Sequence, residues 1–165
     1  MLDLLNVESY DLVGYSMGAM IAVHAAARDA RVRKLVLSGN GAYLLERAKA
    51  DGVFLSVEIA DALSTDDPAR ITDHAGAFLR KVADASQADR LALSALARST
   101  FERLPVDAVS VPTLVLVGDA DLFAWGAERL TDAIAGARLE LVPGDHISTL
   151  HNVRYATSVL GFLAV

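Results

Sequence analysis

The sequence predicts an α/β fold: a short, mainly parallel β-sheet with helices flanking it. Four short apolar runs have the character of buried strands, and they lie near residues 11–15, 35–39, 113–118 and 138–142. Stretches of helical periodicity separate them, which is the pattern of a parallel sheet covered by helices. The length of 165 residues suffices for one domain with a hydrophobic core.

The first strand runs directly into a G-x-S-x-G pentapeptide, Gly14-Tyr15-Ser16-Met17-Gly18, and an apolar helical stretch follows it. A serine on so tight a strand-to-helix turn is held in a strained backbone conformation, with its hydroxyl exposed at the carboxyl end of the strand. We expect the glycines on both sides to let strand and helix approach closely. In this context the motif predicts a catalytic nucleophile rather than a structural turn.

Two later segments have the form of strands with functional loops. Residues 111–121 are an apolar strand that runs into a Gly-x-x-Asp loop, and residues 139–146 are a strand whose loop ends in a histidine. With the serine motif, they resemble the α/β-hydrolase superfamily, in particular its esterase, enol-lactonase and haloperoxidase-like branch. Its triad runs in the order Ser, Asp or Glu, His. The resemblance implies Ser16 as nucleophile, Asp121 as orienting carboxylate and His146 as general base.

The carboxylate has an alternative in Asp119, two residues earlier in the chain. The family pattern places the acid three residues after the glycine, and this selects Asp121. Either aspartate could instead cap the helix expected near residues 126–135, because aspartate is a favoured residue at helix N-termini.

The other histidines are weaker candidates than His146. His151 falls within the apolar pattern of the final helix, expected over residues 150–163, so we expect it to be a partly exposed helix residue. His24 lies in the helix after the serine, where a core or surface role is the better interpretation. His74 has charged neighbours and is expected to be exposed.

The resemblance also implies an oxyanion hole in which Met17 supplies one backbone N–H. The second donor comes from a loop after the family's third strand, and that loop has no counterpart among the 15 residues before Ser16. Residues 1–8 are expected to be the tail of the helix that precedes the serine-bearing strand. The expected fold is therefore a partial α/β-hydrolase fold, truncated at its N-terminal side. Because the second oxyanion donor is lacking, we expect the turnover of substrate to be weak.

Residues 42–108 are almost entirely helical in pattern and are expected to form a cap inserted into a core of residues 1–41 and 109–165. The chain is thus expected to be a single domain over residues 1–165. Within the cap, one helix is expected over 43–62, with Gly52 as a potential break. Another starts at 64–68 and runs to about Val82, and a further helix spans 88–102.

Aromatic and apolar residues near the predicted site are candidates for the substrate pocket. Tyr15, Phe123 and Trp125 flank the nucleophile or follow the acid, although Trp125 could equally pack at the start of the next helix. Several cap residues could line an acyl site, with packing between cap helices as the simpler interpretation of each: Phe54, Leu55, Ile59, Phe78 and Phe101.

Composition excludes several classes of function. The net charge is −6, and the densest basic stretch, residues 28–34, is expected to be a solvated turn. A nucleic-acid partner is therefore not expected. The chain has no cysteine, which excludes disulfides and a thiol nucleophile. No histidine pair has helical metal-ligand spacing, and neither a metal nor a cofactor is predicted. The absence of a membrane-length apolar run and of a secretory signal predicts a cytoplasmic protein without a membrane partner.

Hydrophobic residues make up 53% of the chain, and the mean hydropathy is +0.37, which is high for a small monomer. In the partial fold the serine-bearing strand would lie at the edge of the sheet, and an unpaired apolar edge recruits another strand. We therefore expect a homo-oligomer, most simply a two-fold dimer joined through or beside that edge.

The sequence as a whole predicts a serine hydrolase that cleaves small or medium carboxylic esters, or lactones, through an acyl-enzyme intermediate. The alternative is a catalytically inert hydrolase remnant that acts as an oligomeric binding or assembly module. The ordered serine, aspartate and histidine favour the enzyme, because no structural role requires these three residue types at these turns.

Overall fold

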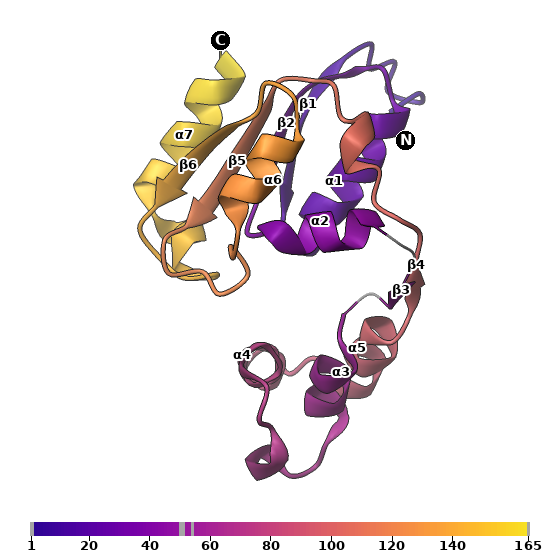
Figure 1. Ribbon diagram of the computed structural model, residues 1–165, viewed down its shortest axis with the longest axis vertical. Helices are drawn as coiled ribbons and strands as arrows, with labels where there is room; N and C mark the ends of the chain where they lie inside the picture. Colours follow the sequence, from indigo (N-terminus) through magenta and orange to yellow (C-terminus); the bar gives the residue numbers. More distant parts are fainter. Residues whose placement is uncertain (1, 50–51, 54, 165) are drawn as a thin grey trace. The chain divides into compact units, whose positions relative to one another are not determined.

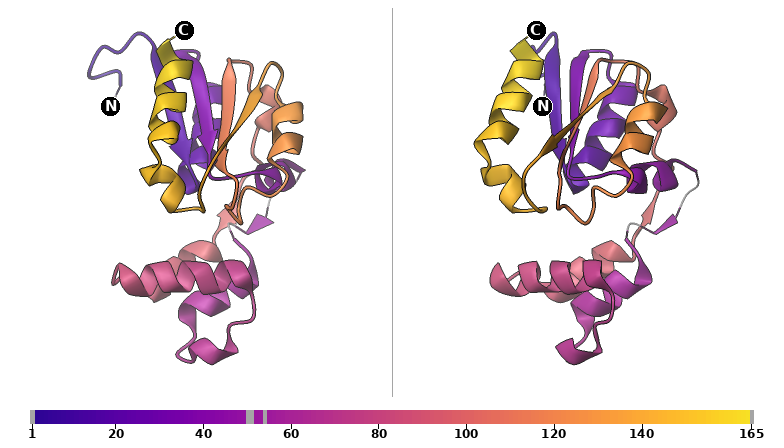
Figure 2. Two further views of the ribbon diagram at one scale, coloured as in Figure 1. Left: turned by 90° about the vertical axis from the view of Figure 1, so that its left-hand side faces the viewer. Right: turned by 60° about the vertical axis from the view of Figure 1, so that its left-hand side comes forward.

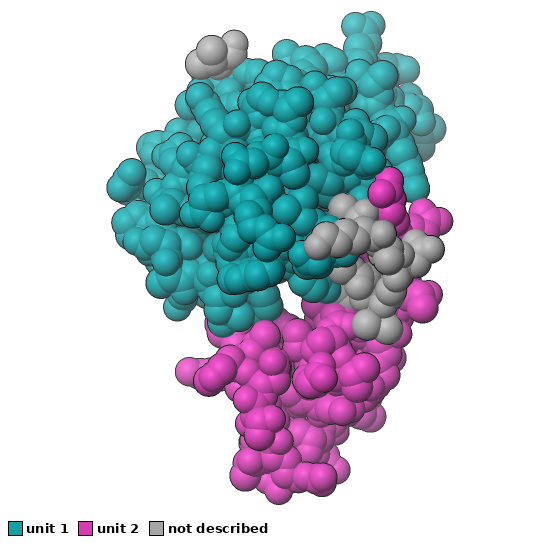
Figure 3. Space-filling view, in the orientation of Figure 1, with its two compact units in different colours: residues 1–49, 104–165 teal, residues 50–103 magenta. Residues whose placement is uncertain are grey.

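The computed structural model of the protein describes residues 2–49, 52–53 and 55–164. The chain divides into two compact units, coloured separately in Figure 3: Met1–Lys49 with Leu104–Val165, and Ala50–Arg103. The first unit carries the parallel sheet and the second is mainly helical (Figure 1). Helix α2 (Ala42–Lys49), which the sequence placed in the cap, belongs to the sheet-bearing unit.

Within the described residues, the main sheet has four parallel strands in the order β1-β2-β5-β6. They match the four predicted strands and confirm the α/β fold class: β1 Tyr10–Tyr15, β2 Val32–Ser38, β5 Thr113–Gly118 and β6 Arg138–Val142. The carboxyl ends of parallel strands lie at one edge of a sheet, so the loops after these strands meet there.

Helices cover both faces of this sheet. Figure 2 shows α7 (Val153–Ala164) on one face, and α1 (Met17–Arg28) and α6 (Ala127–Ala133) on the other. Every residue of β5 is buried, as expected for a parallel strand covered on both faces. The core between α7 and the sheet consists of Val36, Leu114, Leu116 and Val142 from the strands and Phe162 from α7. Among the described residues, each helix is too short or too polar to span a lipid bilayer.

Residues 2–6 form turns rather than the helix tail expected over residues 1–8. The backbone N–H groups of Leu5 and Asn6 donate to carbonyls three residues earlier, each at 3.2 Å, which is a turn pattern. Asn6 has a φ of 51°, and this left-handed conformation ends any continuation as a right-handed helix. The expectation of a helix was therefore wrong here.

Among the strands that the structure describes, β1 lies at an edge of the sheet, as the sequence predicted, because it pairs with β2 alone. Large apolar side chains are exposed on β1 and on the helix that follows it: Val13, Met17 and Ile21. An unpaired edge with apolar surroundings is a template for pairing with another chain. We therefore propose that two copies of this chain associate through or beside β1.

Size-exclusion chromatography with light scattering tests this association. We expect a particle of twice the 17.5 kDa chain mass, and we expect Val13→Lys to shift it toward the monomer, because charged side chains disfavour edge pairing. Val153→Lys, which adds the same charge at an exposed apolar position on α7, should leave the mass unchanged. A wild-type chain that elutes as a monodisperse monomer would contradict the proposal.

The second unit contains more turns and strands than the sequence predicted. The helix expected over 43–62 is two helices: α2, in the sheet-bearing unit, and α3 (Val57–Ser64), in the second unit. Gly52 lies between them, so the break predicted there is confirmed. The helix expected from 64–68 to Val82 is a 3₁₀ turn, Pro68–Arg70, followed by α4 (His74–Ala85). The physical reason lies in two capping aspartates: Asp67 accepts a hydrogen bond from Ala69 N–H, and Asp73 accepts one from Gly76 N–H, so each aspartate begins a new element.

The helix expected over 88–102 ends early as α5 (Arg90–Ala97). Thr100 and Phe101 instead form strand β4, which pairs antiparallel with β3 (Gly52–Val53). Threonine and phenylalanine both favour strands over helices, and the pairing across about fifty residues of chain decides between the two conformations.

The second unit has a hydrophobic core of its own: Ile59, Ala60, Leu63, Ala83 and Ala97. Ile59 and Leu55, both considered for an acyl site, pack in or against this core, which favours the packing interpretation for them. Phe78 and Phe101 are partly buried, and Phe54 lies outside the described residues.

A buried arginine also holds this unit together. The Arg80 guanidinium donates to the carbonyl oxygens of Ala62 at 3.1 Å and Thr65 at 2.7 Å, and it pairs with Asp84 at 2.8 Å. Carbonyl groups at a helix C-terminus lack hydrogen-bond donors within the helix. The charged Arg80 guanidinium supplies donors to these carbonyl groups at the end of α3.

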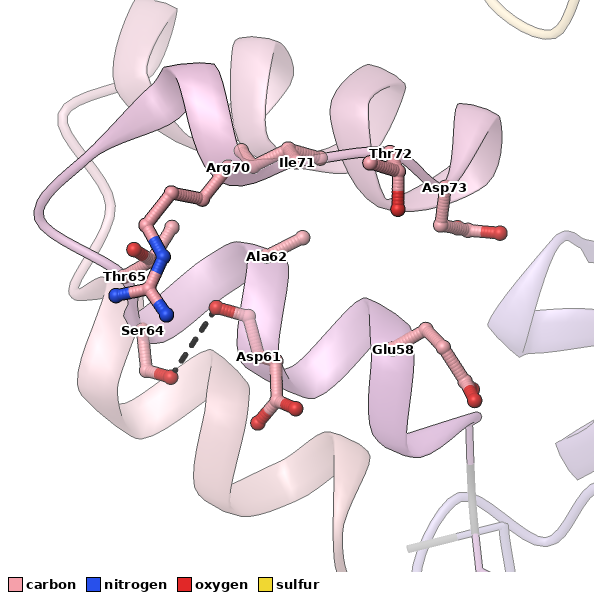
Figure 4. Close-up of a pocket in the computed structure, with 9 residues that line it drawn as sticks. All are labelled: Glu58, Asp61, Ala62, Ser64, Thr65, Arg70, Ile71, Thr72 and Asp73. Atoms are coloured by element: carbon pink, nitrogen blue, oxygen red, sulfur yellow. Dashed lines mark hydrogen bonds between the residues drawn. The ribbon is translucent and has the colours of Figure 1, made fainter.

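The second unit carries a polar cavity of about 380 Å³ (Figure 4). The figure shows the Arg70 side chain beside Ser64 and Thr65, and the Glu58 carboxylate at the other end of the cavity. The Ser64 hydroxyl donates to the Asp61 carbonyl at 3.3 Å. All residues that line the cavity belong to this unit, whereas Ser16, Asp121 and His146 belong to the other.

Candidate active site

Ser16 stands at the turn between β1 and α1 with φ 53° and ψ −119°. A non-glycine residue with positive φ is strained, which is what the G-x-S-x-G motif predicts for a nucleophile. A Cβ added to Gly14 would lie 2.4 Å from the backbone oxygen of Gly18, so strand and helix approach too closely for a side chain at position 14. At Gly18 an added Cβ would meet nothing within 4 Å, so the expectation that both glycines permit this approach holds for Gly14 alone.

Three side chains from distant parts of the sequence form a continuous hydrogen-bonded chain. The Nε2 atom of His146 lies 3.0 Å from the Oγ of Ser16. Its Nδ1 atom lies 2.8 Å and 3.0 Å from the two carboxylate oxygens of Asp121. The Asp121 side chain is 0% exposed and that of His146 is 7% exposed, so both are shielded from water. The structure thus brings together the serine, acid and histidine that the sequence singled out.

The two candidate acids have different surroundings. Asp121 contacts His146 and also accepts a hydrogen bond from Phe123 N–H at 2.8 Å. Asp119 accepts one from Gly144 N–H at 3.0 Å, which ties the loop after β5 to the loop after β6. Neither caps α6, because the N-cap of that helix is Gly126. Geometry therefore separates an aspartate that faces the imidazole from one that joins two loops.

Aromatic residues pack around the imidazole. The Tyr15 hydroxyl donates to the backbone carbonyl of His146 at 2.7 Å, and its ring centroid lies 5.3 Å from that of the imidazole. The ring of Phe123 lies 4.6 Å from the imidazole, centroid to centroid. Burial raises the pKa of the Tyr15 phenol, with a smaller contribution from the charge of Asp121. The phenol therefore stays protonated at neutral pH and remains a donor.

One buried polar residue that contacts Ser16 was not predicted from the sequence. Asn40 follows β2, is 5% exposed, and donates from Nδ2 to the backbone oxygen of Ser16 at 2.7 Å. The available signal was its position: it comes directly after a predicted parallel strand, and therefore at the same edge of the sheet as the serine.

The sequence also matches a known protein family over most of its length. The sequence pattern of a family described as "Alpha/beta hydrolase family" matches residues 2–157. The chain belongs to the alpha/beta hydrolase family. A comparison with curated protein sequences found no match.

This hydrolase is similar to several solved structures. A hydrolase from Pseudomonas aeruginosa is 25% identical, with a TM-score of 0.63 over 99% of this chain and 68% of that one. The enol-lactonase from Burkholderia xenovorans is also 25% identical, with a TM-score of 0.64 over 99% and 69%. An esterase from Exiguobacterium antarcticum, at 19% identity, shares the fold with a TM-score of 0.67 over 99% and 70%.

The remaining histidines of the hydrolase are not members of this chain of hydrogen bonds. His151 is exposed in a 3₁₀ turn, Ser148–His151, and α7 begins only at Val153, so the expected final helix starts three residues later than predicted. His74 is exposed at the start of α4, as expected, and His24 is partly buried within α1.

Asp145, the neighbour of His146, shapes the loop that carries the histidine. Its carboxylate accepts hydrogen bonds from the backbone N–H groups of Ser148 at 2.8 Å and Ile147 at 3.0 Å. These hydrogen bonds, with that of Ser148 the largest, hold the pKa of Asp145 below its usual range. A carboxylate that is ionised and bound in this way stabilises the turn after His146.

Met17 is the first residue of α1, so its backbone N–H has no acceptor within the helix. The positive end of the helix dipole also lies here, which favours an anionic oxygen. Both features suit the predicted oxyanion donor. Within the described residues, no group of three or more histidine or acidic side chains could hold a metal ion.

The aromatic pocket candidates differ in their surroundings. Tyr15 and Phe123 both contact the imidazole, as described above, and are partly buried. Trp125 is exposed just before α6, with the Arg129 guanidinium 5.5 Å from its ring centroid. The roles of these three residues at a pocket rim stay predictions.

Proposed function

We propose that this hydrolase is a serine esterase or lactonase that cleaves small or medium carboxylic esters through an acyl-enzyme intermediate. The observation that carries the proposal is the continuous contact from Ser16 Oγ to His146 Nε2, at 3.0 Å, and from His146 Nδ1 to Asp121, at 2.8 Å. An ionised carboxylate only accepts hydrogen bonds, so the proton of a neutral imidazole lies on Nδ1. The lone pair of Nε2 then faces the serine hydroxyl and can accept its proton.

In the acylation step, Ser16 Oγ attacks the ester carbonyl carbon while His146 Nε2 takes the hydroxyl proton. The carbonyl oxygen becomes an oxyanion, to which Met17 N–H donates. Asp121 stabilises the imidazolium and keeps its orientation. The alcohol oxygen then leaves with the proton from Nε2, and the acyl group remains on Ser16 as an ester.

In the deacylation step, His146 takes a proton from water, and the resulting hydroxide attacks the acyl carbonyl. The Ser16 oxygen leaves and recovers its proton from Nε2. The products are a carboxylic acid and the free serine. A lactone follows the same route, with its ring oxygen as the leaving group, so that one hydroxy acid is released.

The substrate class rests on the site chemistry and on similarity. Structures with this fold include an enol-lactonase and an esterase. Met17 N–H is the one oxyanion donor assigned among the described residues, and a donor of this kind typically contributes about 10²–10³ in rate. Activated esters, whose leaving groups need little assistance, are therefore the best first substrates.

The test compares the wild-type chain with Ser16→Ala on p-nitrophenyl acetate, p-nitrophenyl butyrate and a δ-lactone. A fluorophosphonate probe titrates the reactive serine in parallel. We expect Ser16→Ala to reduce ester hydrolysis to the background rate and to abolish labelling, because the nucleophile is lost. Ser9→Ala, which removes an exposed serine from the same unit, should retain both.

Equal rates for wild type and Ser16→Ala, with no labelling of either, would contradict the proposal. That outcome would favour the alternative of an inert binding or assembly module. A labelled wild type that cleaves esters but not the lactone would narrow the substrate class to esters.

A further inference from the structure

The loop after β2 contacts the segments that carry both the nucleophile and the acid. The side chain of Asn40 donates to the Ser16 carbonyl at 2.7 Å. The next two backbone N–H groups, of Gly41 and Ala42, donate to the carbonyls of Phe123 at 2.9 Å and Trp125 at 2.6 Å. Residues 40–42 therefore join the serine turn to the loop that follows Asp121.

The end of β2 restrains the peptide groups on both sides of Ser16. Ser16 N–H donates to the carbonyl of Ser38 at 2.9 Å. The carbonyl of Ser16 accepts from Asn40 Nδ2, and from Ala19 N–H within the first turn of α1 at 2.9 Å. A strained backbone persists only where its surroundings over-determine it, and these bonds supply that restraint.

We propose that Asn40 is a positioning residue for the nucleophile; this inference rests on the proposed serine hydrolase function. Asn40 holds the strained turn in the conformation that places Ser16 Oγ 3.0 Å from His146 Nε2. It acts through the backbone of Ser16 rather than on the substrate. The backbone of the same loop holds the acid-bearing segment, so this loop sets the spacing between nucleophile and acid.

The role is specific to an amide side chain at this position. Alanine has no donor, and an ionised aspartate has the same shape as asparagine but can only accept hydrogen bonds. Aspartate at position 40 would place its carboxylate against the Ser16 carbonyl, where asparagine donates. Both substitutions therefore remove the restraint, and the second does so without a change in side-chain volume.

The test measures the second-order rate constant for reaction of Ser16 with a fluorophosphonate, together with kcat and KM for p-nitrophenyl butyrate. We expect Asn40→Ala and Asn40→Asp to lower the reaction rate constant and kcat about 10- to 100-fold, because a displacement of about 1 Å can cost that much. KM should change less than about twofold, since Asn40 does not contact the substrate.

Thr113→Ala is the control for a purely structural effect. Thr113 is fully buried in the same unit and donates from its hydroxyl to the Val111 carbonyl at 2.8 Å, so its loss also removes a buried hydrogen bond. We expect it to lower the midpoint of thermal unfolding but to leave Ser16 reactivity at the wild-type value. All rates are measured well below the unfolding midpoint of each variant.

The possible outcomes separate the two proposals. If the wild type reacts at Ser16 and either Asn40 variant reacts equally fast, Asn40 has no positioning role and the inference alone is overturned. The same follows if Thr113→Ala slows the reaction as much as Asn40→Ala does. A wild type without reactive Ser16 overturns the proposed function, and this inference with it. If Asn40→Ala does not fold, Asn40→Asp decides.

Discussion

Asp121→Asn is expected to lower kcat for ester hydrolysis by about 10⁴-fold while the fold is retained. An asparagine amide facing Nδ1 of His146 can donate a hydrogen bond, which favours the tautomer with its proton on Nε2. That nitrogen lies 3.0 Å from Ser16 Oγ and could then no longer accept the serine proton. The measurement is kcat for p-nitrophenyl butyrate, with the rate of fluorophosphonate labelling as a second readout.

Asp119→Asn provides the matched control for this prediction. The substituted side chain keeps the oxygen that accepts from Gly144 N–H, so the link between the two loops survives. We expect its kcat to stay within about twofold of wild type. If Asp119→Asn lost activity and Asp121→Asn kept it, the acid would have to be reassigned.

Gly14→Ala is expected to lower the free energy of unfolding of the sheet-bearing unit by about 3 kcal/mol. The new Cβ would meet the Gly18 oxygen at 2.4 Å and the Ala19 Cα at 2.8 Å. Both are backbone atoms, so α1 would have to move away from β1. The single tryptophan of the sequence, Trp125, lies in this unit, and its fluorescence in urea reports the unfolding.

Gly18→Ala changes the other glycine of the same motif, and here we expect no loss of stability. Position 18 lies in α1, and an added Cβ there meets nothing within 4 Å. Alanine is a better helix former than glycine, so the free energy of unfolding should stay the same or rise by up to about 1 kcal/mol. Destabilisation of the same size at both positions would show that strand–helix contact at Gly14 is not the cause.

Much of the sheet-bearing unit could be predicted from the sequence because its signals are local and strong. Strand β5 is a continuous apolar run, and its observed bounds, Thr113–Gly118, are the predicted ones. The serine turn carries a motif whose glycine and serine have conformational requirements that few other residues meet. The acid and histidine follow predicted strands, and parallel strands bring such loops to one edge of the sheet.

The second unit was predicted less well because its signals are short and ambiguous. A run such as residues 64–85 has helical periodicity throughout, but Asp67 and Asp73 each cap an element by accepting backbone hydrogen bonds. Periodicity does not reveal which of several capping residues will act. Strand β4 at Thr100–Phe101 depends on pairing with β3, a contact that no local pattern encodes.

By itself, the sequence determined the fold class and the four strands, and it singled out Ser16, Asp121 and His146 as candidates, because these follow from short patterns and their order. The tertiary structure decided that Asp121 rather than Asp119 faces His146, and that Asn40 holds Ser16. It also decided that Tyr15 supports the histidine loop across 131 residues of chain. Each of these contacts requires a distance and a direction between side chains or backbone atoms from different strands. Those quantities arise only when strand order and register place the loop ends beside one another.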